Sequence, residues 1–150
     1  NYSMRYILII TIFCFYNCKS QDKKNDKDLW KEKLANMQYY VLREKGTEYP
    51  FTGIYNNHFD KGTYVCKGCN ALLYKSENKF DSACGWPSYD KAIPGAIEYI
   101  KDSSHGMKRI EIVCSNCGCH QGHVFDDGPT SSGRRYCVNS ASIIFKPNEK

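Results

Sequence analysis

One cysteine of this chain, Cys137, stands in a setting that favours chemistry. It lies in the stretch Arg134-Arg135-Tyr136-Cys137-Val138-Asn139-Ser140, directly after two arginines. Positive charge nearby favours the thiolate, which is the nucleophilic form of cysteine. Taken alone, such a cysteine is equally well explained by burial in a core, since free cysteine is among the most buried residue types. The arginines and the following asparagine make a nucleophile the sharper hypothesis.

Four other cysteines form two pairs with the spacing of metal ligands. The pairs are Cys66-Lys67-Gly68-Cys69 and Cys114-Ser115-Asn116-Cys117. Two such pairs complete a tetrahedral sulfur site, which suits structural zinc because no coordination position stays open. The alternative is a thioredoxin-type redox dithiol at each pair. The duplication and the lack of a strand–helix–strand pattern disfavour it, so we predict a zinc site made of Cys66, Cys69, Cys114 and Cys117.

A second thiol and two imidazoles are candidate partners for Cys137. Cys84 lies in the aromatic segment Cys84-Gly85-Trp86-Pro87-Ser88, a setting that suits a redox partner. His120 and His123 are candidate general acids because imidazole titrates near neutral pH. Structural alternatives are a packed thiol for Cys84 and a core position for His123 or Trp86.

From about residue 29 to residue 145 the chain resembles the B-type methionine-R-sulfoxide reductases. The resemblance is carried by residues 85–88 (GWPS), 122–129 (GHVFDDGP) and 135–142 (RYCVNSAS), with the segment 46–53 ahead of them. These strings are highly specific in combination and occur in the family's order. Two positions depart from the family pattern, Cys119 and Gln121, which flank His120.

The resemblance implies an oxidoreductase that acts on protein-bound, and conceivably free, methionine-R-sulfoxide. It implies a fold that is mainly β, with two antiparallel sheets in a β-tent arrangement, an N-terminal helix and a four-cysteine zinc site. No organic cofactor is expected. The resemblance implies Cys137 as nucleophile, Cys84 as resolving cysteine and Trp86 as a substrate-binding residue. From the chemistry of the residues themselves we add His123, His120 and Asn139 as catalytic candidates and Arg135 as a substrate-binding candidate.

The chemistry agrees with this assignment. Sulfoxide reduction needs a soft nucleophile and an acid that protonates the departing oxygen, which a thiolate and an imidazole provide. Attack leaves methionine and a sulfenic acid on Cys137. Cys84 would then condense with it to a disulfide, which a thioredoxin-like reductant resets. Arg134 and Arg135 are expected to lower the pKa of Cys137.

The chain of 150 residues is long enough for one domain with a core, and 41% apolar against 25% charged residues indicates a globular body. An amphipathic helix is expected from about residue 29 to residue 43, packed on its own domain. Short strands are predicted at 63–65, 72–74, 97–100, 109–113, 123–125, 135–138 and 141–145.

The N-terminus has the pattern of an export signal. Arg5 precedes an apolar run of signal-peptide length, and residues 1–18 resemble a loose lipoprotein signal with Cys18 as the lipidated residue. We therefore expect an exported, periplasmic or membrane-anchored protein with a signal at 1–18, a polar tether at 19–28 and the reductase domain at 29–146. The alternatives are an uncleaved anchor or a different start residue.

A formal net charge of +5 is mild, and the lysines gather mainly at 19–33, so we expect no binding to nucleic acid. We also expect a monomer. The rival hypothesis is a zinc-stapled binding module without catalysis. It has no need for Cys137, and its basic residues should gather on one face. A disulfide-stapled scaffold is opposed by the odd number of cysteines after residue 18 and by the metal-ligand spacing.

Overall fold

A computed structural model describes residues 26–148 and divides the chain into two compact units, Asn1–Ala35 and Asn36–Lys150. In the first unit, residues 26–33 are helical, and the indole Nε1 of Trp30 donates to the carboxylate of Asp26 at 3.1 Å. The expectation of one continuous helix through residue 43 is wrong. The helix ends before Leu34, and α2 (Asn36–Glu44) begins at an asparagine, a residue favoured at helix starts.

The buried face of α2 is formed by Tyr39, Val41 and Leu42. Met37 and Tyr40 recur with the other apolar residues of the expected helix near helical spacing, yet each is 46% exposed. The helix packs against strand β7 and the turn at Ser140–Ser142, and these contacts decide which side is covered. Apolar spacing alone predicted the helix but gave the wrong face for these two side chains.

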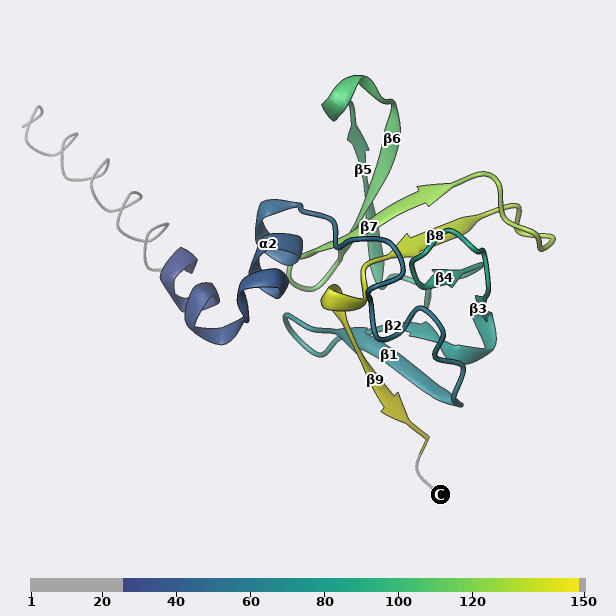
Figure 1. Ribbon diagram of the computed structural model, residues 1–150, viewed down its shortest axis with the longest axis horizontal. Coiled ribbons are helices and arrows are strands. Elements are labelled where there is room, and N and C mark those ends of the chain that lie inside the picture. The colour runs from purple at the N-terminus through teal and green to yellow at the C-terminus, as the bar shows by residue number, and fades with distance from the viewer. Residues whose placement is uncertain (1–25, 149–150) are drawn as a thin grey trace, which may run out of the picture. The chain divides into compact units, whose positions relative to one another are not determined.

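The second unit is built from nine short strands in two antiparallel sheets (Figure 1). The strands are β1 (Gly62–Cys66), β2 (Leu72–Lys75), β3 (Lys79–Phe80), β4 (Ser88–Tyr89), β5 (Ile97–Asp102), β6 (Arg109–Cys114), β7 (His120–Phe125), β8 (Arg135–Val138) and β9 (Ile143–Pro147). The predicted mainly-β fold with two antiparallel sheets is confirmed. β3 and β4 were not predicted, because two residues are too few to show a repeat.

The small sheet has the order β2-β1-β9 and the large sheet the order β3-β4-β8-β7-β6-β5. Buried tyrosines pack between them: the rings of Tyr74 on β2 and Tyr89 on β4 stack at 4.3 Å, and Tyr64 on β1 meets Tyr89 edge-on at 5.3 Å. Aromatic rings of this size bury a large apolar area, so they hold the sheets together.

The register of the large sheet places reactive residues in one row. Glu111 on β6 pairs with His123 on β7, His123 pairs with Cys137 on β8, and Cys137 pairs with Ser88 on β4. Directly paired residues point to the same face of a sheet. Four segments distant in sequence therefore contribute side chains to one surface.

An irregularity in β7 brings His120 and His123 together. Residues three apart on a regular strand point to opposite faces. Here Ile112 pairs with Gly122 and Val113 with His120, so Gln121 is an extra, bulged residue. As a result the two imidazole rings lie 5.6 Å apart. Gly122 is required at this point, since a Cβ there would lie 2.0 Å from the carbonyl oxygen of Cys137.

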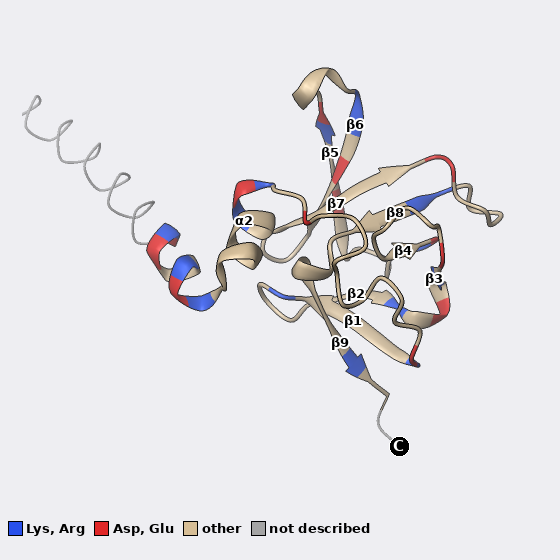
Figure 2. Ribbon diagram, viewed as in Figure 1, with Lys and Arg blue, Asp and Glu red and all other residues tan. Residues whose placement is uncertain are grey.

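Lysines and arginines are interspersed with acidic residues along the ribbon (Figure 2). Among the described residues, no helix has the length and apolar character needed to cross a membrane. The predicted signal segment and the Cys18 site lie outside the described residues.

Candidate active site

The sulfur atoms of Cys84 and Cys137 lie 3.9 Å apart, at the junction of β4 and β8. A disulfide needs a separation of about 2 Å, so closure requires a movement of about 2 Å. Two serines hold the Cys84 sulfur: Ser82 Oγ donates to it at 2.9 Å and Ser88 Oγ lies 3.6 Å away. The structure thus brings together the two thiols that the sequence assigned to one redox pair.

The two thiols ionise as a pair. Hydrogen bonding to Cys84, followed by burial, raises the pKa of Cys137 well above its ordinary value, and Arg135 only partly opposes this. The hydrogen bond from Cys137, with further donation from Ser82 and Ser88, lowers the pKa of Cys84 to about 4 against the effect of burial. The expected lowering of the Cys137 pKa is therefore not found in this arrangement. The reduced pair carries one negative charge, held on the Cys84 side.

Cys137 opens onto a cavity of about 220 Å³. This is smaller than the roughly 300 Å³ at which pockets for drug-sized ligands begin, so it suits a single side chain. The lining is largely apolar and consists of Thr47, Trp86, Arg109, Gly122, His123, Phe125, Cys137, Val138 and Asn139. The indole Nε1 of Trp86 donates to the carbonyl of Glu48 at 3.1 Å, which fixes the ring at the cavity wall. Cys84 lines a different cleft.

His123 is held by a carboxylate from the neighbouring hairpin. Its Nε2 lies 2.8 Å from Oδ2 of Asp102, and Nη2 of Arg109 donates to the same oxygen at 2.7 Å. Burial lowers the pKa of His123, and the hydrogen bond to Asp102 opposes that effect. Hydrogen bonds from Ser104 first, and then from His123, hold the pKa of Asp102 well below its usual range. This imidazole faces the cavity with its carboxylate partner behind it.

His120 lies deeper and does not line the cavity. Its Nδ1 is 2.8 Å from Oε1 of Glu111, whose other oxygen accepts from Lys45 Nζ at 2.7 Å. Burial lowers the pKa of His120 while Glu111 opposes it. The buried Nε2 of His120 has no hydrogen-bond partner among residues 26–148. The structure therefore places His120 behind His123.

Asn139 lines the cavity, and its amide is engaged by the backbone. Its Oδ1 accepts from the N–H of Glu48 at 3.0 Å, and its Nδ2 donates to the carbonyl of Gln121 at 3.1 Å. The buried carboxylate of Glu48 accepts from the N–H groups of Ser140 and Ala141 at 2.6 and 2.9 Å. Glu48 thereby fastens the 46–53 segment to the end of β8.

The two arginines before Cys137 contact different groups. Arg135 makes a two-pronged ion pair with Asp127, with both distances 2.8 Å, and lines the Cys84 cleft rather than the cavity. Its charge lowers the pKa of Cys137, although other effects prevail. Arg134 packs over the ring of Tyr99 at 5.8 Å. Arg135 is thus placed beside the thiol pair, and its predicted contact with substrate remains a prediction.

The four cysteines of the two knuckles converge where β1 and β6 end. Their sulfur atoms all lie within 4.8 Å of one another, with 3.7 Å between Cys66 and Cys117 and 3.6 Å between Cys69 and Cys114. Ligands at the zinc–sulfur distance of about 2.3 Å sit about 3.8 Å apart on a tetrahedron. The residues present fit a tetrahedral ion, and such an ion would join the two sheets.

Five site residues were missed by the sequence analysis, namely Glu48, Ser82, Ser88, Asp102 and Glu111. The sequence predicted the strand that contains Glu111, over 109–113, but did not indicate that this side chain is buried. The last four residues of β6 are buried, and a buried glutamate requires a partner. The partners of the other four come from segments distant in sequence or from loop geometry.

The chain is similar to known proteins over most of its length. Residues 34–147 match the SelR domain family. The peptide methionine sulfoxide reductase MsrB of Alteromonas mediterranea is 52% identical over 132 residues, covering 85% of this chain and 93% of that protein. The MsrB of Agrobacterium fabrum is 54% identical over 125 residues, covering 83% of this chain and 92% of its own length. The mitochondrial methionine-R-sulfoxide reductase B3 of Mus musculus is 50% identical over 133 residues, covering 85% of this chain and 53% of that protein.

Proposed function

Since this chain belongs to the methionine-R-sulfoxide reductase B family, oxidoreductases that reduce methionine sulfoxide, we propose that Cys137 carries out the reduction and Cys84 resolves it. One observation carries the proposal: Cys137 lines a largely apolar cavity, and its sulfur lies 3.9 Å from the sulfur of Cys84, which lines a different cleft. Substrate and resolving thiol can then reach the same atom without competing for space.

In the first step the Cys137 thiolate attacks the sulfoxide sulfur while the oxygen takes a proton. The products are methionine and a sulfenic acid on Cys137. For this step the negative charge must pass from Cys84 to Cys137, which requires a proton to cross the 3.9 Å between them. Trp86 and Phe125 supply the apolar wall for the substrate methyl group, and His123 is the acid nearest the oxygen.

In the second step Cys84, which took the Cys137 proton in the first step, condenses with the Cys137 sulfenic acid: a sulfur–sulfur bond forms, the sulfur–oxygen bond breaks, and the oxygen leaves as water with the thiol proton of Cys84. Ser82 and Ser88 lie within hydrogen-bond distance of the Cys84 sulfur and favour its thiolate, which is the attacking form. The resulting disulfide is reduced by an external dithiol, and we propose a thioredoxin-like protein. The cleft lined by Phe80, Ser82, Cys84 and Pro129 gives such a protein access to the Cys84 sulfur.

The ion at the four cysteines is proposed to be zinc in a structural role. All four ligands come from the protein, so no position stays open for substrate. Gln121 Nε2 donates to the Cys66 sulfur at 3.6 Å, which suits a sulfur that carries negative charge. The cluster supplies rigidity, and no step of the reaction passes through it.

The family acts on methionine sulfoxide in proteins, and we propose that free methionine sulfoxide is a poorer substrate. The cavity encloses a side chain and leaves the chain that carries it outside. We further propose that the protein is exported, as the pattern of residues 1–18 predicts, and that it acts as a monomer.

The test is turnover of the separated R and S epimers of a methionine-sulfoxide peptide, with dithiothreitol as reductant. We expect reduction of the R epimer by wild type and complete loss in Cys137→Ser. Cys84→Ser should release one methionine per enzyme and fail to recycle with thioredoxin. A folded Cys137→Ser variant with normal turnover would falsify the nucleophile assignment. A folded, zinc-loaded wild type without turnover would favour a binding module.

A further inference from the structure

The orientation of His123 is determined by residues outside the reactive strings. We propose that Asp102, held by Arg109, is a positioning residue that locks His123 as the Nε2–H tautomer and directs Nδ1 at the substrate oxygen. This inference rests on the proposed function, because it assigns a role to His123 in that same reaction.

The geometry at Asp102 leaves its carboxylate no freedom to turn. Oδ1 accepts the backbone N–H of Ser104 at 2.9 Å, and Oδ2 accepts from both Arg109 and His123. Asp102 and Arg109 are directly paired at the loop end of the β5–β6 hairpin, so the fold sets their spacing. The side chain of Asp102 is 15% exposed and lies in the wall of an adjoining cleft, so its orientation is set by these three hydrogen bonds.

A carboxylate can only accept hydrogen bonds, so the His123 nitrogen that faces Asp102 must carry a proton. In the neutral ring the other nitrogen, Nδ1, then has a free lone pair. Among residues 26–148 nothing hydrogen-bonds to Nδ1, while the ring lines the cavity that contains Cys137. Nδ1 is therefore the nitrogen available to a ligand in the cavity.

The tautomer of His123 matters because it decides which nitrogen gives a proton to the substrate oxygen. Attack by the Cys137 thiolate on the sulfoxide sulfur breaks the sulfur–oxygen bond and forms the sulfenic acid, while the imidazolium gives its Nδ1 proton to the oxygen. Charge and atoms balance, since one thiolate and one imidazolium become neutral groups. The Asp102 carboxylate stabilises the imidazolium and keeps the donating nitrogen in line.

Charged and titratable groups surround His123 from every packed element. They are Asp102 on β5, Arg109 and Glu111 on β6, His120 on β7 and Cys137 on β8, with Glu44, Lys45, Lys101 and His105 around the adjoining cleft. Arg109 and burial disfavour the imidazolium, whereas Asp102 favours it. Removing Asp102 should therefore shift the balance in one direction, towards an imidazole that protonates only at lower pH.

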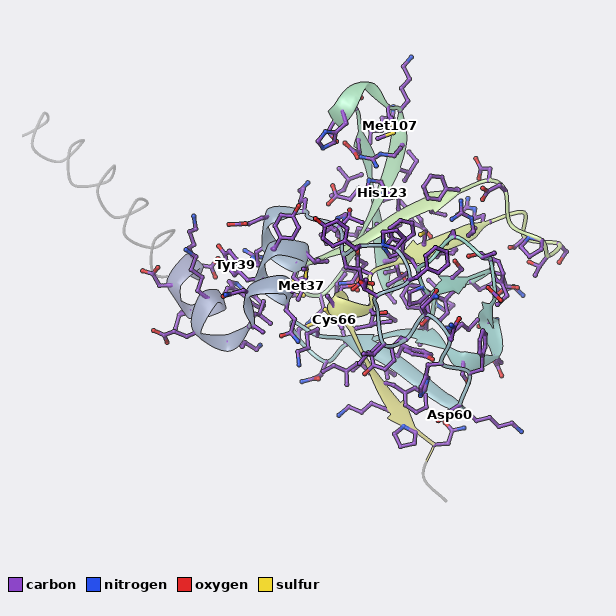
Figure 3. All side chains as sticks on the ribbon, viewed as in Figure 1. Met37, Tyr39, Asp60, Cys66, Met107 and His123 are labelled. Atoms are coloured by element: carbon purple, nitrogen blue, oxygen red, sulfur yellow. The ribbon has the colours of Figure 1, made fainter. Side chains whose placement is uncertain are left out.

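The experiment compares Asp102→Asn, Asp102→Glu and the matched control Asp60→Asn. Asp60 has an 81% exposed side chain and lies at the other end of the domain from His123 (Figure 3). The readout is the single-turnover rate of methionine formation against pH, together with nitrogen NMR of histidine to identify the His123 tautomer. Single turnover avoids any effect on recycling by the reductant.

We expect Asp102→Asn to lower the single-turnover rate about 100-fold with little change in substrate affinity, and to move the alkaline limb to lower pH. Asp102→Glu should recover part of the rate, and Asp60→Asn should match wild type. NMR of wild type should show Nε2–H at His123. A wild-type rate and pH profile in Asp102→Asn, or an Nδ1–H tautomer in wild type, overturns the proposal. If Asp102→Asn does not fold, the wild-type tautomer still decides. Inactive wild type would instead refute the proposed function.

Discussion

Replacing Cys84 by serine should make Cys137 easier to ionise. In the reduced enzyme the negative charge lies on Cys84, 3.9 Å from the Cys137 sulfur, and this neighbour is the largest cause of the raised pKa of Cys137. Two like charges at that distance repel by about 4 kcal/mol at an effective dielectric constant of about 20. Serine carries no charge, so the ionisation equilibrium of Cys137 should shift about 1000-fold towards the thiolate.

The assay is the rate of iodoacetamide alkylation at Cys137, followed against pH by peptide mass spectrometry of zinc-loaded protein. The rise in reactivity should move to lower pH in Cys84→Ser than in wild type. The reciprocal variant, Cys137→Ala, should move the reactivity of Cys84 to higher pH, because it removes the hydrogen bond that most lowers the pKa of Cys84. Cys119→Ser, a cysteine-to-serine exchange at a buried thiol outside the pair, serves as the control.

If Cys137 in Cys84→Ser becomes reactive over the same pH range as in wild type, or at higher pH, the reasoning is refuted. That result would show that Cys84 does not hold the charge. The same experiment bears on the order of events. If Cys137 is ionised in the absence of Cys84, single turnover in Cys84→Ser should become less dependent on pH near neutrality. Attack would then no longer wait for the transfer of a proton between the two sulfurs.

Three further predictions concern the scaffold. Cys117→Ser should abolish zinc binding, measured by elemental analysis, and with it the cooperative thermal transition, because a structural zinc site contributes about as much free energy as a whole domain retains. Gly122→Ala should lower the free energy of unfolding by about 3 kcal/mol in a urea titration, since the new Cβ would meet the carbonyl of Cys137 at 2.0 Å. The control, Gly133→Ala, meets nothing within 4 Å and should cost about 1 kcal/mol. Glu48→Gln should cost about 2 kcal/mol, as an amide cannot accept both backbone N–H groups, and should change the fluorescence of Trp86.

Each of the three scaffold predictions would be contradicted by one specific result. A zinc-free Cys117→Ser protein with the wild-type transition would remove the structural role of the metal. Equal destabilisation by the two alanine variants would show that backbone conformation, rather than close approach, requires Gly122. Unchanged stability in Glu48→Gln would mean that water satisfies the amides of Ser140 and Ala141.

The parts of the site that depend on residue type and local spacing could be predicted from the sequence. The knuckle cysteines are separated by two residues in each pair, and a turn of that length directs both sulfurs to one point whatever the rest of the fold does. Cys137 and Asn139 are two apart on one strand end, so they share a face. Such relations are local, and a single segment of sequence contains them.

Relations that depend on register could not be predicted in the same way. His120 and His123 share a face because Gln121 is bulged, and nothing in the three residues themselves requires a bulge. Asp102 reaches His123 only through the pairing of β5 with β6 and of β6 with β7. Met37 and Tyr40 were placed on the wrong side of α2 because the packing partners, not the apolar spacing, determine the buried face.

The bulged residue also connects the metal cluster to the active site. The side chain of Gln121 donates to the Cys66 sulfur at 3.6 Å, while its carbonyl accepts from Asn139 Nδ2 at 3.1 Å and from the Asn139 backbone N–H at 2.9 Å. The same bulge sets the positions of His120 and His123. A change at the metal cluster therefore reaches the histidines and the cavity through one fully buried residue. Gln121 thus joins the four-cysteine cluster to the asparagine of the cavity by hydrogen bonds from a single residue.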